Sequence, residues 1–282
     1  MAVCCTVHPL QVVDCCIMED GTPVSTLSTL DYGGKCLRDE GIHTALFEDD
    51  GTLPGCLLQA AAAHSGVPIF ECNSSSCCPP SCPQRSTQGA AAVDLVVGEA
   101  GSAGHGLFLA APVPAGAFLG EYTGNLVSSR AAASTTAAQP VGAHSYHLTY
   151  TEHFTQKGKP REMHTCVDAA RRGSLMRFIN HSCAPNCVVM GVRTHNSVPR
   201  LCVFALRSLP HRAELTLDYG AGEGDGGGSS AAGQPAGKYV AVGQGSARQA
   251  QGAAPDALEA AGRVKCVCGS AACRGFVPFS RA

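Results

Sequence analysis

The chain has 282 residues and a formal net charge of −2, from 20 lysines and arginines against 22 acidic residues. This length allows one large domain or one main domain with small satellites, and the charge balance excludes a global positive field that would hold nucleic acid through its phosphates. Hydrophobic residues make up 45%, which is enough for a core, but no run of about 18 apolar residues predicts a membrane span.

The first 88 residues hold ten of the 17 cysteines. The N-terminus has no basic start and is not expected to be a signal peptide, so we expect an intracellular, reducing compartment. There, grouped cysteines indicate zinc, and a disulfide framework is the alternative. Gly33-Gly34, Pro54-Gly55 and Pro79-Pro80 interrupt helical periodicity. A segment with many thiols and little core usually needs metal to fold.

Residues 92–220 are expected to form the main globular unit, because short β-type runs recur there between clusters of glycine and proline. An alanine-rich stretch at 131–139 is either a short helix or a loose insert. Many short strands with few helices predict a mainly β fold of small sheets. The expected strands are Val93–Val97, Phe118–Tyr122, Tyr146–Tyr150, His164–Val167, Cys187–Val192, Leu201–Leu206 and Glu214–Leu217.

The stretch Arg177–Cys187 places a polar Asn-His-Ser triplet and a thiol beside an apolar pair. Asparagine, histidine and serine side chains compete with backbone pairing and supply many hydrogen-bond donors and acceptors. A cluster of this kind indicates a ligand-holding loop. An ordinary polar turn before a strand is the alternative.

The composition changes twice after residue 220. Residues 221–262 are rich in glycine, alanine and glutamine and are expected to form a flexible low-complexity linker. Residues 263–279 contain Cys266-x-Cys268-x4-Cys273. Because a structural zinc site takes four ligands in a tetrahedron, these three thiols require a fourth ligand from elsewhere. Three unrelated thiols are the alternative.

Several stretches, taken together and in order, resemble the SET-domain lysine methyltransferases. They are Gly104–Phe108, Gly116–Gly124, Val167–Ala170, Arg177–Asn186, Glu214–Gly220 and the three-thiol tail followed by Arg274–Phe276. Within this family, Pro68–Asn73 and Ser197–Leu201 resemble the SETMAR-type and suppressor-of-variegation-type histone methyltransferases.

The resemblance implies a mainly β SET-domain fold of small curled sheets with a C-terminal pseudoknot, flanked by small zinc-binding cysteine-rich segments. It divides the chain into a degenerate pre-SET-like segment (1–88), a SET catalytic domain (92–220), a flexible insert (221–262) and a post-SET zinc segment (263–279). In the pseudoknot, the segment after Asn180 threads beneath a C-terminal loop, which is rare among folds. This threading would bring Asn180 and His181 beside Tyr219.

The implied activity is transfer of a methyl group from S-adenosyl-L-methionine to a histone-tail lysine, with a histone peptide or nucleosome as partner, in the nucleus and on the chromosome. No strong direct binding of nucleic acid and no membrane association are expected. Tyr219 would align the lysine amine and Tyr122 would be a second catalytic tyrosine, with a place in the core as the alternative for each. The implied cofactor-binding residues are Gly104, His105, Gly106, Tyr146, Arg177, Asn180, His181 and Phe276.

The resemblance also implies the metal ligands. Cys183 would complete the post-SET zinc site with Cys266, Cys268 and Cys273. The pre-SET-like segment has fewer cysteines than the zinc cluster of the family, and Ser76 stands where a cysteine is expected, so the number of ions there stays open. Its candidate ligands are Cys36, Cys56, Cys72, Cys78 and Cys82.

Two residues depart from the family pattern. His105 stands where relatives carry tryptophan, and Leu217 stands where they carry phenylalanine or tyrosine. The smaller leucine leaves more room, so we expect at least dimethylation. These departures keep open a catalytically degenerate SET protein that binds chromatin, and a methyltransferase of non-histone proteins is a third reading. The target stays open between lysine nine and lysine thirty-six of histone three.

Overall fold

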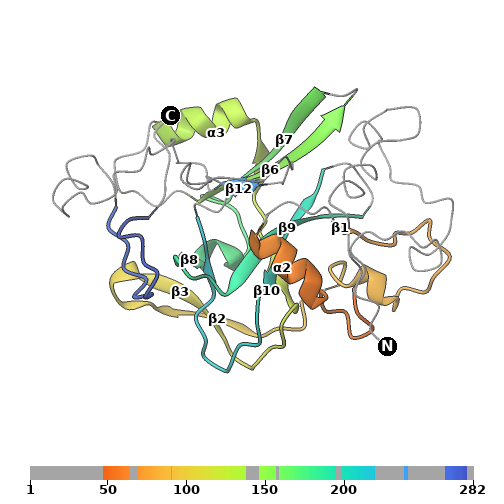
Figure 1. The fold of residues 1–282 in the computed structure, drawn as a ribbon, viewed down its shortest axis with the longest axis horizontal. Coiled ribbons are helices and arrows are strands. Elements are labelled where there is room, and N and C mark those ends of the chain that lie inside the picture. The colour runs from red at the N-terminus through yellow and green to blue at the C-terminus, as the bar shows by residue number, and fades with distance from the viewer. Residues whose placement is uncertain are drawn as a thin grey trace, which may run out of the picture.

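A computed structural model of the chain describes residues 47–63, 69–89, 91–137, 146–156, 159–194, 198–219, 238–240 and 264–277. Within them, short strands form four small sheets and helices are few (Figure 1). The expected mainly β fold is therefore confirmed. Cys36 and most of the expected insert lie outside the described residues.

The two larger sheets each have four strands, in the orders β1-β9-β10-β4 and β12-β6-β7-β5, and the pairs β11-β8 and β2-β3 form two smaller sheets. The helices are α2 (Gly55–Ala63), η2 (Pro83–Arg85), η3 (Gly101–Ala103), α3 (Ser129–Ala137) and η4 (Leu175–Phe178). The strands are β1 (Ile69–Phe70), β2 (Leu95–Glu99), β3 (His105–Leu109), β4 (Phe118–Glu121), β5 (Asn125–Val127), β6 (His147–Gln156), β7 (Lys159–Asp168), β8 (Asn180–His181), β9 (Cys187–Arg193), β10 (Arg200–Ala205), β11 (Thr216–Leu217) and β12 (Lys238–Val240).

The core is built on β9 and β10, which pair with each other in antiparallel fashion. Every residue of β9 is buried, as is all of β10 except its first residue. Continuous apolar runs of this length are typical of strands covered on both faces. α2 packs against β9, and its Leu57 and Leu58 belong to the core (Figure 1). The short strand β11, which belongs to the candidate site, packs against β9 of this sheet.

Helix α2 corrects the expectation that Pro54-Gly55 interrupts helical structure. The Pro54 carbonyl accepts the N–H of Leu57 at 3.0 Å and of Leu58 at 3.2 Å, so the pair begins a helix. Proline is tolerated at this place because its missing N–H is not needed in a first turn. The alanine-rich stretch is a helix as far as Ala137, the last residue of α3, and the Ser128 hydroxyl caps this helix by accepting the N–H of Ala131 at 3.2 Å. None of the helices in the described ranges is long and apolar enough to cross a bilayer.

A buried ion pair joins the two four-stranded sheets. Arg193, the last residue of β9, donates from Nη1 to Glu152 Oε1 at 2.7 Å and from Nη2 to Glu152 Oε2 at 2.6 Å. Both side chains are buried. Glu152 lies on β6, which also pairs with β12 from the segment that was expected to be a flexible insert. The bidentate geometry makes this a strong directional contact between sheets.

The segment before the main unit is fastened by polar side chains. The buried Gln84 amide accepts the Phe47 N–H at 2.9 Å and donates to the Phe47 carbonyl at 2.7 Å. Arg200 on β10 donates to the Thr87 hydroxyl at 3.0 Å and to Glu121 Oε2 at 2.8 Å. The Gln84 contacts close residues 47–84 on themselves, and the Arg200–Thr87 hydrogen bond ties this segment to the sheet of β4 and β10.

Candidate active site and cysteine clusters

Two dipeptide strands from distant parts of the chain meet at the centre of the candidate site. β8 and β11 pair in parallel, and the Ser182 N–H donates to the Leu217 carbonyl at 2.9 Å. The Asn186 amide ties the same segments, because its Nδ2 donates to the Glu214 carbonyl at 2.7 Å and its Oδ1 accepts the Thr216 N–H at 2.8 Å. This is the juxtaposition that the expected pseudoknot requires.

Tyr219 follows β11 and reaches across to the other segment. Its hydroxyl donates to the Ile179 carbonyl at 2.6 Å, and its backbone N–H donates to His181 Nδ1 at 3.1 Å. The rings of His181 and Tyr219 lie 5.4 Å apart between centroids. Burial raises the pKa of Tyr219, so the hydroxyl keeps its proton at neutral pH.

Tyr122 is the second expected catalytic tyrosine, and it is buried at the end of β4. Its hydroxyl donates to the Tyr146 carbonyl at 2.9 Å. Burial raises the pKa of Tyr122, and the neighbouring Tyr219 raises it further. The two phenols are thus neighbours, both are neutral, and each is oriented by a backbone carbonyl.

The glycines of the Gly104–Phe108 stretch serve different purposes. Gly104 has φ +81°, and a Cβ built there would meet nothing within 4 Å. Its backbone conformation therefore favours glycine and leaves open space for a ligand. Gly106 is different, because a Cβ there would lie 2.7 Å from Glu214 Oε1. His105 between them is exposed at the start of β3.

Asn180 and Arg177 bring polar groups to the same region. Asn180 Nδ2 donates to the His105 carbonyl at 3.0 Å and to Glu214 Oε1 at 2.8 Å. The Arg177 guanidinium lies 4.0 Å from the centroid of the Tyr146 ring. The Arg177 Nε is buried with no hydrogen-bond partner among the described residues. A buried donor left in this way costs about 1–3 kcal/mol, which a ligand acceptor would relieve.

His181 connects the tyrosine to the cysteines. Its Nδ1 accepts the Tyr219 N–H, so the proton of the neutral ring sits on Nε2, which lies 3.3 Å from Cys183 Sγ. Burial lowers the pKa of His181 to about 4, although the Asp218 carboxylate opposes the shift. The neutral ring therefore donates to the sulfur at pH 7.

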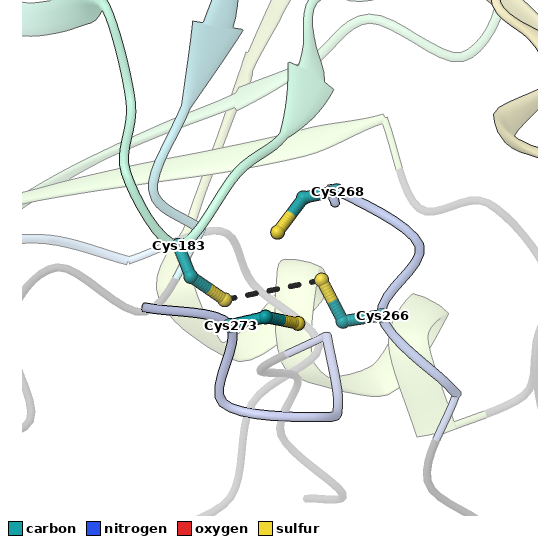
Figure 2. Close-up of side chains that lie close together, drawn as sticks. All are labelled: Cys183, Cys266, Cys268 and Cys273. Atoms are coloured by element: carbon teal, nitrogen blue, oxygen red, sulfur yellow. Dashed lines mark hydrogen bonds between the residues drawn. The ribbon is translucent and has the colours of Figure 1, made fainter. Parts of the chain in front are cut away.

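Four sulfurs gather beside this histidine and face a common centre (Figure 2). We call this set the tail cluster; its members are Cys183, Cys266, Cys268 and Cys273. All four ligand atoms lie within 4.8 Å of one another, and those of Cys183 and Cys266 are 3.8 Å apart. Zn–S bonds of about 2.3 Å in a tetrahedron separate sulfurs by about 3.8 Å, so the donor set fits a closed zinc site.

The C-terminal segment is fastened at two places: the tail cluster joins it to the turn after β8, and an ion pair joins it to the loop that carries Tyr219. Arg274 donates from Nη2 to Asp218 Oδ1 at 2.5 Å, and its backbone N–H donates to Cys183 Sγ at 3.3 Å. Phe276 is half-buried and forms an isolated bridge with Lys265. The role of Phe276 against a cofactor stays a prediction.

The second group of sulfurs is smaller. Cys72, Cys78 and Cys82, which we call the N-terminal cluster, lie within 4.8 Å of one another. Cys56 is exposed on α2 and lies outside this cluster. Ser76 uses its hydroxyl to accept the Asn73 N–H at 3.1 Å. Within the described residues, three of the five candidate ligands are therefore brought together.

The SET domain family model matches residues 104–220. The chain is a SET-domain protein. The histone-lysine N-methyltransferase SETMAR of Bos taurus is 32% identical over 186 residues, which are 66% of this chain and 57% of that protein. The histone-lysine N-methyltransferase SUV39H2 of Xenopus tropicalis is 31% identical over 220 residues, 75% of this chain and 46% of that protein.

Among solved structures, the methyltransferase domain of human SETMAR superposes with a TM-score of 0.66 at 25% identity, covering 94% of this chain and 81% of that chain. The SET-domain protein spans about half the length of the curated relatives it matches. The resemblance drawn from the motifs is confirmed.

Sequence reasoning missed two features of this SET domain. One is Glu214, whose carboxylate contacts Asn180. The other is the ion pair of Arg274 with Asp218. The sequence does show a carboxylate at the start of the Glu214–Leu217 run, an acidic residue before Tyr219 and a basic residue after Cys273. None of these positions reveals which residue it contacts until the fold is known.

Proposed function

We propose that this SET-domain protein is a protein-lysine N-methyltransferase that transfers a methyl group from S-adenosyl-L-methionine to a lysine of a histone tail. The observation that carries the proposal is the pairing of β8 with β11, because it sets the neutral Tyr219, a neighbour of the neutral Tyr122, beside the Asn-His pair. The two curated relatives named above are histone-lysine N-methyltransferases, which supports the same activity.

The cofactor site would be formed where backbone and polar side chains are open to a ligand. S-adenosyl-L-methionine, when bound, supplies a methyl group activated by a sulfonium cation. The Gly104 backbone leaves space for it, and Arg177 Nε is a buried donor that lacks an acceptor among the described residues. The proposed contacts are Gly104, His105, Gly106, Tyr146, Arg177, Asn180, His181 and Phe276.

The two tyrosines would act on the lysine amine. A free lysine has a pKa of about 10.4, so the amine must lose a proton before it can attack. A channel lined by buried rings disfavours the ammonium and lowers that pKa, and we propose that water takes the proton. The oxygens of Tyr219 and Tyr122 are fixed by the Ile179 and Tyr146 carbonyls, so they can accept N–H groups of the amine and align its lone pair.

We propose that a zinc ion in the tail cluster holds residues 264–277 against the loop of Tyr219. The Arg274–Asp218 pair supports the same contact. For the N-terminal cluster we propose at most one ion, since three sulfurs meet there. The proposed organisation remains a pre-SET-like segment (1–88), a catalytic domain (92–220), an insert (221–262) and a post-SET segment (263–279).

Partner and location follow from the same proposal. A histone tail is cationic, which suits a chain with a net charge of −2. We place the protein in the nucleus on chromatin, as befits an enzyme acting on histones. The expectation of no strong direct contact with nucleic acid stays a prediction.

Transfer of a radiolabelled methyl group to core histones tests the proposal. We expect the wild type to label histones and Tyr219→Phe to fall to near background, because the variant loses one hydroxyl and keeps the ring. Tyr150→Phe, which removes a hydroxyl from a buried core tyrosine on β6, is the matched control and should keep its activity.

Two outcomes would overturn the assignment. A wild type that binds nucleosomes but transfers no methyl group would make the protein a chromatin-binding module. A wild type that labels other proteins but no histone would redirect the substrate to non-histone lysines.

A further inference from the structure

We infer that Glu214 is a positioning residue, which fixes the side-chain amide of Asn180 so that its carbonyl oxygen is presented to the methyl donor. The inference rests on the proposed function and assigns a role to a carboxylate that touches no proposed substrate.

The contacts of Asn180 determine which way its amide faces. The side chain meets two groups, the His105 carbonyl at 3.0 Å and Glu214 Oε1 at 2.8 Å. A carbonyl and a carboxylate can only accept hydrogen bonds, so the Nδ2 group must face them. Oδ1 is then the side-chain atom of Asn180 left to meet a ligand, and it can only accept.

The carboxylate is itself held in place by the backbone around it. The Glu214 carbonyl accepts Asn186 Nδ2 at 2.7 Å, and Glu214 forms an isolated bridge with Phe108 on β3. The next residue, Leu215, donates its N–H to the Leu107 carbonyl at 2.8 Å. The backbone at Glu214 is therefore fixed, and this limits where its carboxylate can lie relative to Asn180.

Gly106 provides the space for this contact. A Cβ there would lie 2.7 Å from Glu214 Oε1 and 3.1 Å from Asn180 Nδ2, so a side chain would displace the carboxylate, the amide or both. The requirement for glycine at this position is thus explained by the Glu214–Asn180 contact as well as by any ligand.

A carboxylate suits the task better than a neutral acceptor. Its hydrogen bond to an amide is charge-assisted and stronger than a neutral one. A flipped Asn180 would also turn Oδ1 toward two acceptors, which is repulsive. Glutamine at 214 could donate to a flipped Oδ1, so it would weaken the selection while keeping the shape.

The test measures binding of S-adenosylhomocysteine, an unreactive product, to the full chain by calorimetry. We expect Glu214→Leu to weaken binding about tenfold, as for loss of one charge-assisted hydrogen bond, and Glu214→Gln to weaken it about threefold. The KM for the methyl donor should rise in parallel while kcat changes less. Glu99→Leu removes an exposed carboxylate from β2, beside β3, and should change neither.

A double variant separates positioning from a general loss of structure. In an Asn180→Ala background, Glu214→Leu should have no further effect on binding. The inference is overturned if Glu214→Leu binds like the wild type, if its effect persists without the Asn180 amide, or if Glu214→Gln loses as much affinity as Glu214→Leu. A wild type that fails to bind S-adenosylhomocysteine would instead sink the proposed function.

Discussion

The tail cluster and the N-terminal cluster differ in the number of sulfurs and in the parts of the chain that supply them. The tail cluster has four, of which Cys183 comes from the turn after β8 and three come from residues 264–277 (Figure 2). The N-terminal cluster has three, all within one short stretch. The first joins two distant segments, and the second closes a loop on itself.

The surroundings of the two clusters differ as well: hydrogen bonds hold the stretch around the N-terminal cluster, whereas little of the C-terminal segment is buried. Near the N-terminal cluster, Arg85 donates to the Asn73 carbonyl at 2.6 Å, and Asn73 donates to the Thr194 carbonyl at 3.0 Å. The C-terminal segment is mostly exposed, and Cys266 is its one buried residue among those described. A segment with so little buried surface depends on a metal for its order, so removal of an ion should matter most at the tail.

Cys273→Ser should have the largest effect. Serine cannot supply a thiolate ligand, so the tail cluster should lose its ion and the segment should leave the loop of Tyr219. We expect elemental analysis to show one zinc fewer per chain and methylation to fall to near background. Cys77→Ser, at an exposed cysteine outside both clusters, should preserve both quantities. A zinc-deficient Cys273→Ser protein with wild-type methylation would show that the tail ion is dispensable.

Arg274→Ala should have an intermediate effect. It breaks the pair with Asp218, which is partly exposed and is therefore expected to contribute about 0.2–1 kcal/mol. The methylation rate should fall by up to about fivefold while the zinc content stays unchanged. Arg212→Ala, at an exposed arginine, is the control. A loss of zinc in Arg274→Ala would mean that the pair and the metal act as one unit.

Cys78→Ser should have a small effect on rate. The N-terminal cluster can lose one ion at most, and its surroundings keep their hydrogen bonds. We expect methylation within about twofold of the wild type, because the hydrogen bonds of Arg85 and Asn73 hold this stretch in place without the ion. A collapse of activity here, comparable with that of Cys273→Ser, would erase the distinction between the clusters.

Leu217→Phe should alter the product more than the rate. Leu217 is buried on β11, where it pairs with His181. The wild type should yield at least dimethyllysine, and the larger ring should shift a mass-spectrometric time course toward monomethyllysine. Leu201→Met, a core change on β10, serves as control. A wild type that stops at monomethyllysine would refute the expectation.

Most of the longer strands of the main unit could be predicted because their residues alternate or run apolar over several positions, as in Cys187–Arg193, but β3 and β5 were not among the expected strands. The tail cluster could be predicted from the spacing of its thiols together with the motif resemblance. Three closely spaced thiols in Cys266–Cys273 leave one tetrahedral position open, and a motif resemblance supplied Cys183.

Some contacts between side chains distant in sequence were beyond prediction, although the motif resemblance did place Asn180 and His181 beside Tyr219. β11 falls within the expected strand Glu214–Leu217, but β8 has only two residues, too few for a periodic pattern. The two strands pair because Asn186 and the backbone hold them together. Gln84 fastens Phe47, yet nothing local marks that glutamine as buried. Pro54-Gly55 was misread because the same pair that ends one helix can begin another.

The pair of Glu152 and Arg193 limits how the sequence of this protein can change. Replacing Arg193 alone would leave a carboxylate in a dry interior at a penalty of about 3–5 kcal/mol, whereas exchanging both residues for a matched apolar pair would be close to neutral. The two positions should therefore vary together across descendants of this chain. A designer who replaces Arg193 in one sheet must also replace Glu152 in the other.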